Sequence, residues 1–140
     1  MSLSPLDKEV RDLEKTRTCV FQTNYHLIWA PKYRRKVLVG SVEVRLEELL
    51  KTIAVQSGVQ LLAVRVHNCD HVHLFVSAPP KWSVPELVRV FKCNSAKVLF
   101  EEFPQIKLRL WGGHLWSEGY AVRTAGDVTG AKIEEYINRK

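Results

Sequence analysis

Residues 59–77 read VQLLAVRVHNCDHVHLFVS, and this stretch decides the fold. It contains two runs of apolar and β-branched residues, 59–67 and 71–77, which are typical of β-strands. The tight corner at 68–70 (NCD) between the runs predicts two strands joined by a turn. One long bent strand is the alternative. Either reading places a sheet at the centre of the fold.

Working outward, strands and helices alternate along the chain. Strands are expected at 18–30, 106–111 and 114–123, with a turn at Gly112-Gly113, and helices at 42–56, 83–102 and 127–138. Residues 4–16 form a short polar helix or a frayed arm, so that 1–17 is an N-terminal arm. Ser83 and Glu86 would cap the helix at 83–102. The order β-α-β-β-α-β-β-α predicts an α+β fold, in which helices pack on one face of an antiparallel sheet. Lys107 and Arg109 would give this sheet a positive edge or face.

The composition indicates one globular domain, residues 1–140. Apolar residues make up 46% and charged residues 26% of the 140 positions, which excludes a disordered chain. The formal net charge of +6 favours a polyanionic partner. We expect a cytoplasmic protein with reduced thiols, because the three cysteines form no CxxC pair and no signal or membrane segment is visible.

The strongest local signal is the pair His71 and His73. Residues i and i+2 of a strand point to one side, so both rings could bind one divalent metal ion. The alternative is that the two histidines face solvent by chance. Asp70 turns away from them and is expected to be a corner residue that supports the ligands. His67 and Cys69 continue the alternation, but four such positions would span about 20 Å along a strand and could not share one tetrahedral ion. We therefore interpret His67 as an ordinary strand residue and Cys69 as a turn residue.

Two further signals are a tyrosine on the last expected helix and a set of basic and aromatic residues. Tyr136 lies at helical spacing from Ile133, and core packing is the ordinary role of such a side chain. Cations bind phosphates, and aromatic rings stack on unpaired bases. A solvated basic surface over an aromatic core is the alternative. The basic residues are Lys32, Arg34, Arg35, Lys36, Lys92, Lys97, Lys107 and Arg109, and the aromatic residues are Tyr33, Trp82, Phe91, Trp111 and Trp116.

Several segments together carry a family pattern. They are Tyr25-His26-Leu27-Ile28-Trp29, Lys32-Tyr33-Arg34, Asp70-His71-Val72-His73-Leu74, Phe91-Lys92 with Ser95 and Lys97, Leu115-Trp116 with Gly119-Tyr120, and Tyr136-Ile137. In this order and at these separations they resemble the single-tyrosine HUH transposases of the insertion-sequence-200/605 family, over residues 18–140. The resemblance implies a ferredoxin-like fold related to the RNA-recognition fold, in a homodimer.

The resemblance also implies a chemistry. It implies that His71 and His73 hold Mg²⁺ or Mn²⁺ and that Tyr136, on the helix at 127–140, attacks a phosphodiester of single-stranded DNA. A 5′-phosphotyrosine link and a free 3′-OH result, and rejoining needs no nucleotide cofactor. The DNA would carry hairpins near the ends of the element, and the tyrosine helix of one subunit would serve the histidine pair of the other. The DNA-contacting residues would be Lys32, Tyr33, Arg34, Arg35, Lys92 and Lys97.

One position departs from the family pattern. A glutamine one helical turn after the tyrosine usually completes the metal site, but that position is Lys140, whose ammonium has no lone pair. An inactive or domesticated single-stranded nucleic-acid-binding protein of the same fold is therefore one alternative function. A small zinc-dependent hydrolase that uses His71 and His73 is a second. A sheet-based RNA binder that uses Tyr25 and Trp29 is a third.

Overall fold

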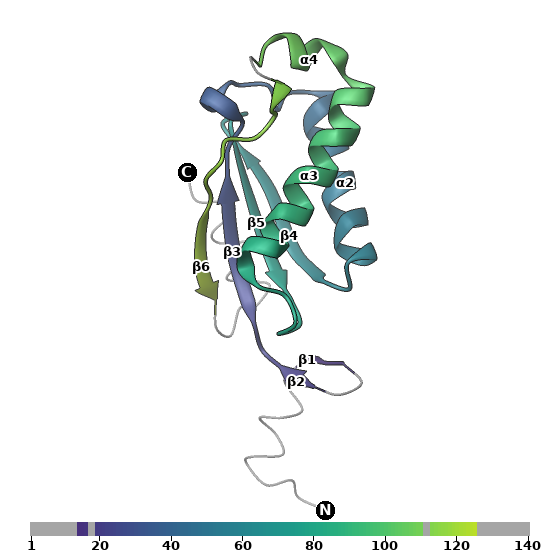
Figure 1. Ribbon diagram of the computed structural model, residues 1–140, viewed down its shortest axis with the longest axis vertical. Coiled ribbons are helices and arrows are strands. Elements are labelled where there is room, and N and C mark those ends of the chain that lie inside the picture. Colours follow the sequence, from purple (N-terminus) through teal and green to yellow (C-terminus); the bar gives the residue numbers. More distant parts are fainter. Residues whose placement is uncertain (1–13, 17–18, 111–112, 126–140) are drawn as a thin grey trace, which may run out of the picture.

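The computed structural model describes residues 14–16, 19–110 and 113–125. Its main sheet has four strands in the order β4-β5-β3-β6, and all neighbours are antiparallel. The strands are β3 (Asn24–Trp29), β4 (Gln60–His67), β5 (His71–Ser77) and β6 (Ala121–Ala125). Helices α2 (Ser41–Gln56) and α3 (Val84–Glu102) lie on the same side of this sheet (Figure 1). The predicted α+β fold is confirmed.

A second, two-stranded sheet lies at the N-terminal side of the described chain. It pairs β1 (Glu14–Lys15) with β2 (Val20–Phe21), at the lower end of the molecule in Figure 1. The strand expected at 18–30 is therefore divided at residues 22–23. Glu14–Lys15 belongs to a strand, so the helix expected at 4–16 is wrong at this end, and residues 4–13 lie outside the described ranges.

The core lies between the sheet and the two long helices. Successive side chains of a strand point to opposite faces, and the apolar positions of β3 and β5 alternate accordingly. Buried side chains from the sheet and from the helices form one cluster, which includes Leu27, Trp29, Val72, Leu74, Val76, Leu46, Leu50, Leu87, Phe91 and Leu99. This packing fixes the strands in register, because a slip by one residue would turn the apolar set away from the helices.

Helix α3 begins as the sequence predicts. Ser83 is the N-cap, and its hydroxyl oxygen accepts the backbone N–H of Glu86 at 3.2 Å. The same hydroxyl donates to the Glu86 carboxylate at 2.8 Å. These bonds satisfy one of the free N–H groups of the first turn, so the start of the helix is fixed by its own sequence.

The strand expected at 106–111 is wrong, because helix α4 (Pro104–Leu108) occupies this region. Pro104 stands at the beginning of α4, where its missing N–H has no consequence. Ile106 and Leu110 are buried, whereas Leu108 between them is 84% exposed. Apolar residues at i and i+4 fit a helix as well as a strand. A strand would turn Leu108 to the same side as Ile106 and Leu110, so the exposure of Leu108 identifies a helix.

The strand expected at 114–123 is shorter and has a different partner. Its structured part is β6, which pairs with β3 and not with the residues around Ile106. The preceding loop is held beside the end of β3, where the Lys32 N–H donates to the Leu115 carbonyl at 2.8 Å. Leu115 is buried in the core.

The corrected elements also move two basic residues. Lys107 lies on α4 and Arg109 is its C-cap, so the positive sheet edge expected from this pair is wrong. Trp111 and Gly112 lie outside the described residues, as does the helix expected at 127–138 with Tyr136. None of the described helices is both long and apolar enough to cross a membrane.

Candidate metal centre

Several histidine side chains gather on the sheet face opposite to α2 and α3. The register of β4 and β5 sets His67 opposite His71 and Arg65 opposite His73. The register of β3 places His26 beside Phe75 and next to Arg123 of β6. We call this surface the histidine face, defined by His26, Arg65, His67, His71, His73 and Arg123. His71 and His73 share it while Val72 between them is fully buried in the core, as the strand alternation predicts.

The turn between β4 and β5 corrects our interpretation of His67. Asn68 and Cys69 have φ angles of 53° and 61°, and this left-handed turn makes the two strands antiparallel. The separation expected for the four alternating positions holds only if they lie in one row along a single strand. Because the chain folds back, the ring centroid of His67 lies 6.1 Å from that of His73. His67 is therefore a member of the cluster, whereas Cys69 is the turn residue that we expected.

His71 is oriented by the carboxylate that precedes it. Its Nδ1 lies 2.6 Å from Oδ1 of Asp70, which is only 4% exposed. A carboxylate accepts the Nδ1–H, which leaves the proton off Nε2 and makes that atom the metal-binding one. Asp70 therefore has the supporting position that the sequence predicts for it.

His73 is oriented by another histidine. Its Nδ1 lies 3.1 Å from Nε2 of His26. Burial lowers the pKa of His73 to about 4, and the neighbouring histidines and Arg65 add to this shift. Burial also lowers the pKa of His26, with a further contribution from Arg123. His73 is therefore neutral at pH 7, which is the form that binds metal ions.

The donor set fits a divalent metal ion in part. The imidazoles of His71 and His73 are ordinary ligands of such ions. Among the described residues, no group of three or more His, Cys, Asp or Glu side chains is placed to hold a metal. The remaining ligands would be water, substrate oxygens or groups beyond the described part of the chain.

The basic segment Lys32–Lys36 lies at the end of the sheet where His71 stands. It follows Trp29, which pairs with Val72. Tyr33 is 61% exposed, and Arg34 and Arg35 are exposed as well. The Lys32 ammonium lies 5.6 Å from the centroid of the Tyr33 ring. The fold thus presents these residues to solvent near the histidine pair.

Lys92 and Lys97 lie elsewhere, on α3. The Lys92 ammonium donates to the carbonyl of Ser117 at 2.6 Å, and the carbonyls of Glu118 and Gly119 lie within 3.4 Å of it. Burial lowers the pKa of Lys92. Both lysines line a groove of about 430 Å³ between α3 and residues 113–118, on the helix side of the sheet. Lys92 is thus an anchor for the loop, and neither lysine is brought to the histidine face.

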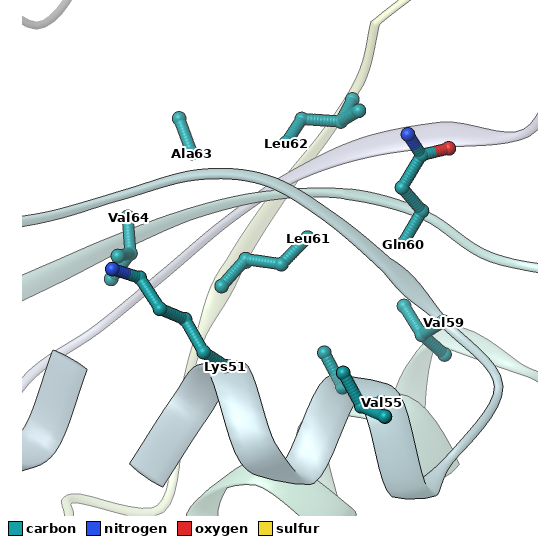
Figure 2. Close-up of a pocket in the computed structure, with 9 residues that line it drawn as sticks. Lys51, Val55, Val59, Gln60, Leu61, Leu62, Ala63 and Val64 are labelled. Atoms are coloured by element: carbon teal, nitrogen blue, oxygen red, sulfur yellow. The ribbon is translucent and has the colours of Figure 1, made fainter. Parts of the chain in front are cut away.

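A second groove lies between α2 and the edge strand β4 (Figure 2). It measures about 370 Å³ and is lined mainly by aliphatic side chains such as Val55, Val59 and Leu61, with Lys51 at its margin. No histidine contributes to its lining. Because it lies away from the histidine face, it is not the candidate site.

Two aromatic residues of the basic and aromatic set, Phe91 and Trp116, belong to the core. Phe91 is fully buried, and Trp116 is buried. Trp29 is 2% exposed, and Tyr25 packs against the core cluster. The sheet-based RNA binder would need Tyr25 and Trp29 on an accessible face. Their packing toward the helices disfavours that alternative.

The sequence patterns predict no role for three residues of the histidine face: His26, Arg65 and Arg123. The available signal was strand alternation, since Arg65 stands two residues before His67. The register between β3, β5 and β6 was the missing information, because residues distant in sequence meet only once the strands are paired.

Comparison with known proteins places the chain among transposases. The family model described as "Transposase IS200 like" matches residues 19–140. The ISDra2 transposase TnpA of Deinococcus radiodurans is 43% identical over 126 residues, which cover 90% of this chain and 89% of that protein. The transposase for insertion sequence element IS200 of Salmonella typhimurium is 33% identical over 116 residues, which cover 83% and 75%.

The solved structures with a similar fold include two that are described as transposases. The crystal structure of a Deinococcus radiodurans R1 protein that is described as a transposase superposes with a TM-score of 0.75 at 42% identity, and covers 89% of this chain and 95% of that one. A REP-associated tyrosine transposase bound to a REP hairpin gives a TM-score of 0.57 at 11% identity, over 89% and 68% of the two chains. The second likeness concerns the fold alone.

Proposed function

Because the chain belongs to the IS200-like transposase family, we propose that it cleaves and rejoins single-stranded DNA through a covalent 5′-phosphotyrosine intermediate. The family assignment favours a transposase over the zinc hydrolase and the RNA binder that the sequence left open. The observation that carries the proposal is the pair His71 and His73 on one sheet face, each with its Nδ1 in a hydrogen bond.

The proposed reaction divides between a histidine pair and a tyrosine. A Mg²⁺ or Mn²⁺ ion bound by His71 and His73 would supply Lewis-acid stabilisation of the charge on the scissile phosphate. The Tyr136 oxygen attacks the phosphorus and loses its proton. The bond from phosphorus to the 3′-oxygen breaks, and that oxygen leaves as a 3′-OH. A different 3′-OH then reverses the step and releases the tyrosine, so the phosphodiester energy is conserved.

The proposed DNA path crosses the histidine face. Arg65 on β4 and Arg123 on β6 flank the histidines from the two outer strands. Among the described residues, Arg45 forms ion pairs with Glu48 and Glu102, whereas Arg65 and Arg123 form none. The basic segment Lys32–Lys36 extends this positive surface at the end of β3. Cationic side chains of this kind bind the phosphates of a single strand.

We propose a DNA hairpin and a second copy of the chain as partners. The REP-associated relative is bound to a hairpin, and hairpins are what the family resemblance implies for the ends of an element. The main sheet has two outer strands, β4 and β6, and the side chains of residues 121–124 on β6 are exposed. Such an edge is able to pair with another chain.

The decisive experiment is capture of the covalent intermediate. Wild-type protein, incubated with Mn²⁺ and a hairpin-bearing single strand, is expected to form an adduct that survives denaturing electrophoresis. Tyr136→Phe is expected to abolish the adduct, because phenylalanine has no nucleophilic oxygen, and to retain DNA binding. Tyr120→Phe is the matched control, since Tyr120 is an exposed tyrosine just before β6.

Two outcomes contradict the proposal. An adduct formed by Tyr136→Phe would show that another residue is the nucleophile. Hairpin binding without any wild-type adduct would favour the inactive binding protein, to which Lys140 already points.

A further inference from the structure

The residue of interest is His26, which lies on β3 beside the proposed metal ligand His73. Strand pairing sets His26 opposite Phe75 and His73 opposite Ile28, so the two histidines are diagonal neighbours on one face. Nε2 of His26 and Nδ1 of His73 are 3.1 Å apart, which is a hydrogen-bond distance.

The His26 ring is held firmly in this position. It stacks on Phe75 with a centroid distance of 4.2 Å and an interplanar angle of 7°. The residue is 4% exposed. A buried ring that is packed on a neighbouring aromatic face presents its nitrogen in one direction, as a positioning group must.

From this geometry we infer that His26 is a positioning residue, which accepts the Nδ1–H of His73 and thereby fixes Nε2 of His73 as the metal-binding atom. The inference rests on the proposed role of His71 and His73. In a hydrogen bond between two neutral imidazoles, one nitrogen donates and the other accepts. If His73 binds metal through Nε2, its proton is on Nδ1, so Nε2 of His26 is the acceptor.

The two ligands would then be supported differently. Asp70 gives His71 a carboxylate acceptor at 2.6 Å, whereas His26 gives His73 a neutral one at 3.1 Å. Partners of this kind set the tautomer and orientation of a ligating histidine, and their loss typically weakens metal affinity by about 10–100-fold. His26 is thus the counterpart of Asp70 for the second ligand.

The test combines two variants with a spectroscopic measurement. His26→Phe keeps an aromatic ring against Phe75 but removes the acceptor, and His26→Gln restores an acceptor as a carbonyl oxygen. We expect Mn²⁺ affinity, measured by titration of the free ion signal in electron paramagnetic resonance, to fall about 10–100-fold in His26→Phe and to recover in His26→Gln. Thermal unfolding of the metal-free variants checks that they are folded.

The tautomer itself is measured in the metal-free wild type. Long-range ¹H–¹⁵N correlation spectra of the His73 ring are expected to show the proton on Nδ1, and this result does not depend on the folding of any variant. A proton on Nε2 would overturn the inference, as would equal losses of affinity in the two variants or an unchanged affinity in His26→Phe. A wild type that binds no Mn²⁺ would instead refute the metal step of the proposed function, and the spectra would still decide the hydrogen bond.

Discussion

At the level of single residues, two buried tryptophans differ in the partners of their indole N–H groups. Trp116 donates from Nε1 to the Lys92 carbonyl and to the Ser95 hydroxyl, both at 3.1 Å. Nε1 of Trp29 is buried and has no hydrogen-bond partner among the described residues. The two rings are in contact edge to face, with centroids 5.9 Å apart.

This difference predicts different effects of the same substitution. Trp116→Phe removes a partner from the buried Ser95 hydroxyl, whereas Trp29→Phe removes an N–H that bonds to none of the described residues. We expect Trp116→Phe to lower the free energy of unfolding by about 1–2 kcal/mol more than Trp29→Phe. Urea denaturation of the two variants measures it. Equal losses would mean that ring volume alone determines the effect.

The histidines show what the spacing of residues in the sequence can predict and what it cannot. Alternation along one strand was enough to place His71 and His73 on one side and Val72 in the core. The same reasoning failed for His67, because its neighbour is set by the turn that folds β4 back on β5. The contact between His26 and His73 could not be predicted for a similar reason, because it depends on the pairing of β3 with β5.

At the level of elements, one lysine of α3 connects this helix to the loop that follows α4. Lys92 of α3 donates to the carbonyls of residues 117–119, which lie outside the described strands. Those carbonyls lead directly into β6. The helix thereby holds the chain in place before the last described strand begins.

This arrangement predicts a larger loss of stability for the substitution of Lys92 than for that of Lys97. Lys92→Met is expected to lower the free energy of unfolding by about 1–3 kcal/mol, because the loop carbonyls lose a charged donor. Lys97→Met, one turn and a half along α3, is expected to change stability by less than about 0.5 kcal/mol, as an exposed substitution does. Denaturation of both variants at pH 7 measures the difference. A larger loss in Lys97→Met would contradict the anchoring role.

The elements also show where pattern reading succeeds and where it does not. The helix at 41–56 and the capped start of α3 followed from long periodic segments and a local cap. The strand expected at 106–111 is wrong because the apolar residues of this short segment satisfy both periods, and Pro104 at the start of α4 is the local signal for a helix. Short segments contain too few positions to separate the two periods.

At the level of the whole molecule, the histidine face is assembled from distant parts of the chain. Arg65 and Arg123 stand on the outer strands β4 and β6, and β5 and β3 lie between them. The proposed strand of DNA would meet positive charge on both sides of the histidines. Neither arginine is near the other in sequence, so the assembled sheet alone creates this surface.

Salt dependence of DNA binding tests the proposed path. Each phosphate contact that is lost should reduce the slope of log K against log salt by about 0.7 for a single strand. We expect Arg65→Gln and Arg123→Gln each to show this reduction, measured by fluorescence anisotropy with a labelled hairpin oligonucleotide. Arg89→Gln, an exposed change on α3, removes the same charge and is expected to keep the wild-type slope. Unaltered slopes in the first two variants would place the DNA elsewhere.

The strand order determines when the main sheet can be completed during synthesis of the chain. β3 is translated almost a hundred residues before its partner β6. A nascent chain, or a decayed gene copy that stops before residue 121, would contain both proposed metal ligands and lack Arg123 and one side of the central strand. Contacts between such remote segments form slowly, so the histidine face would be complete only after β6 has been translated and has paired with β3.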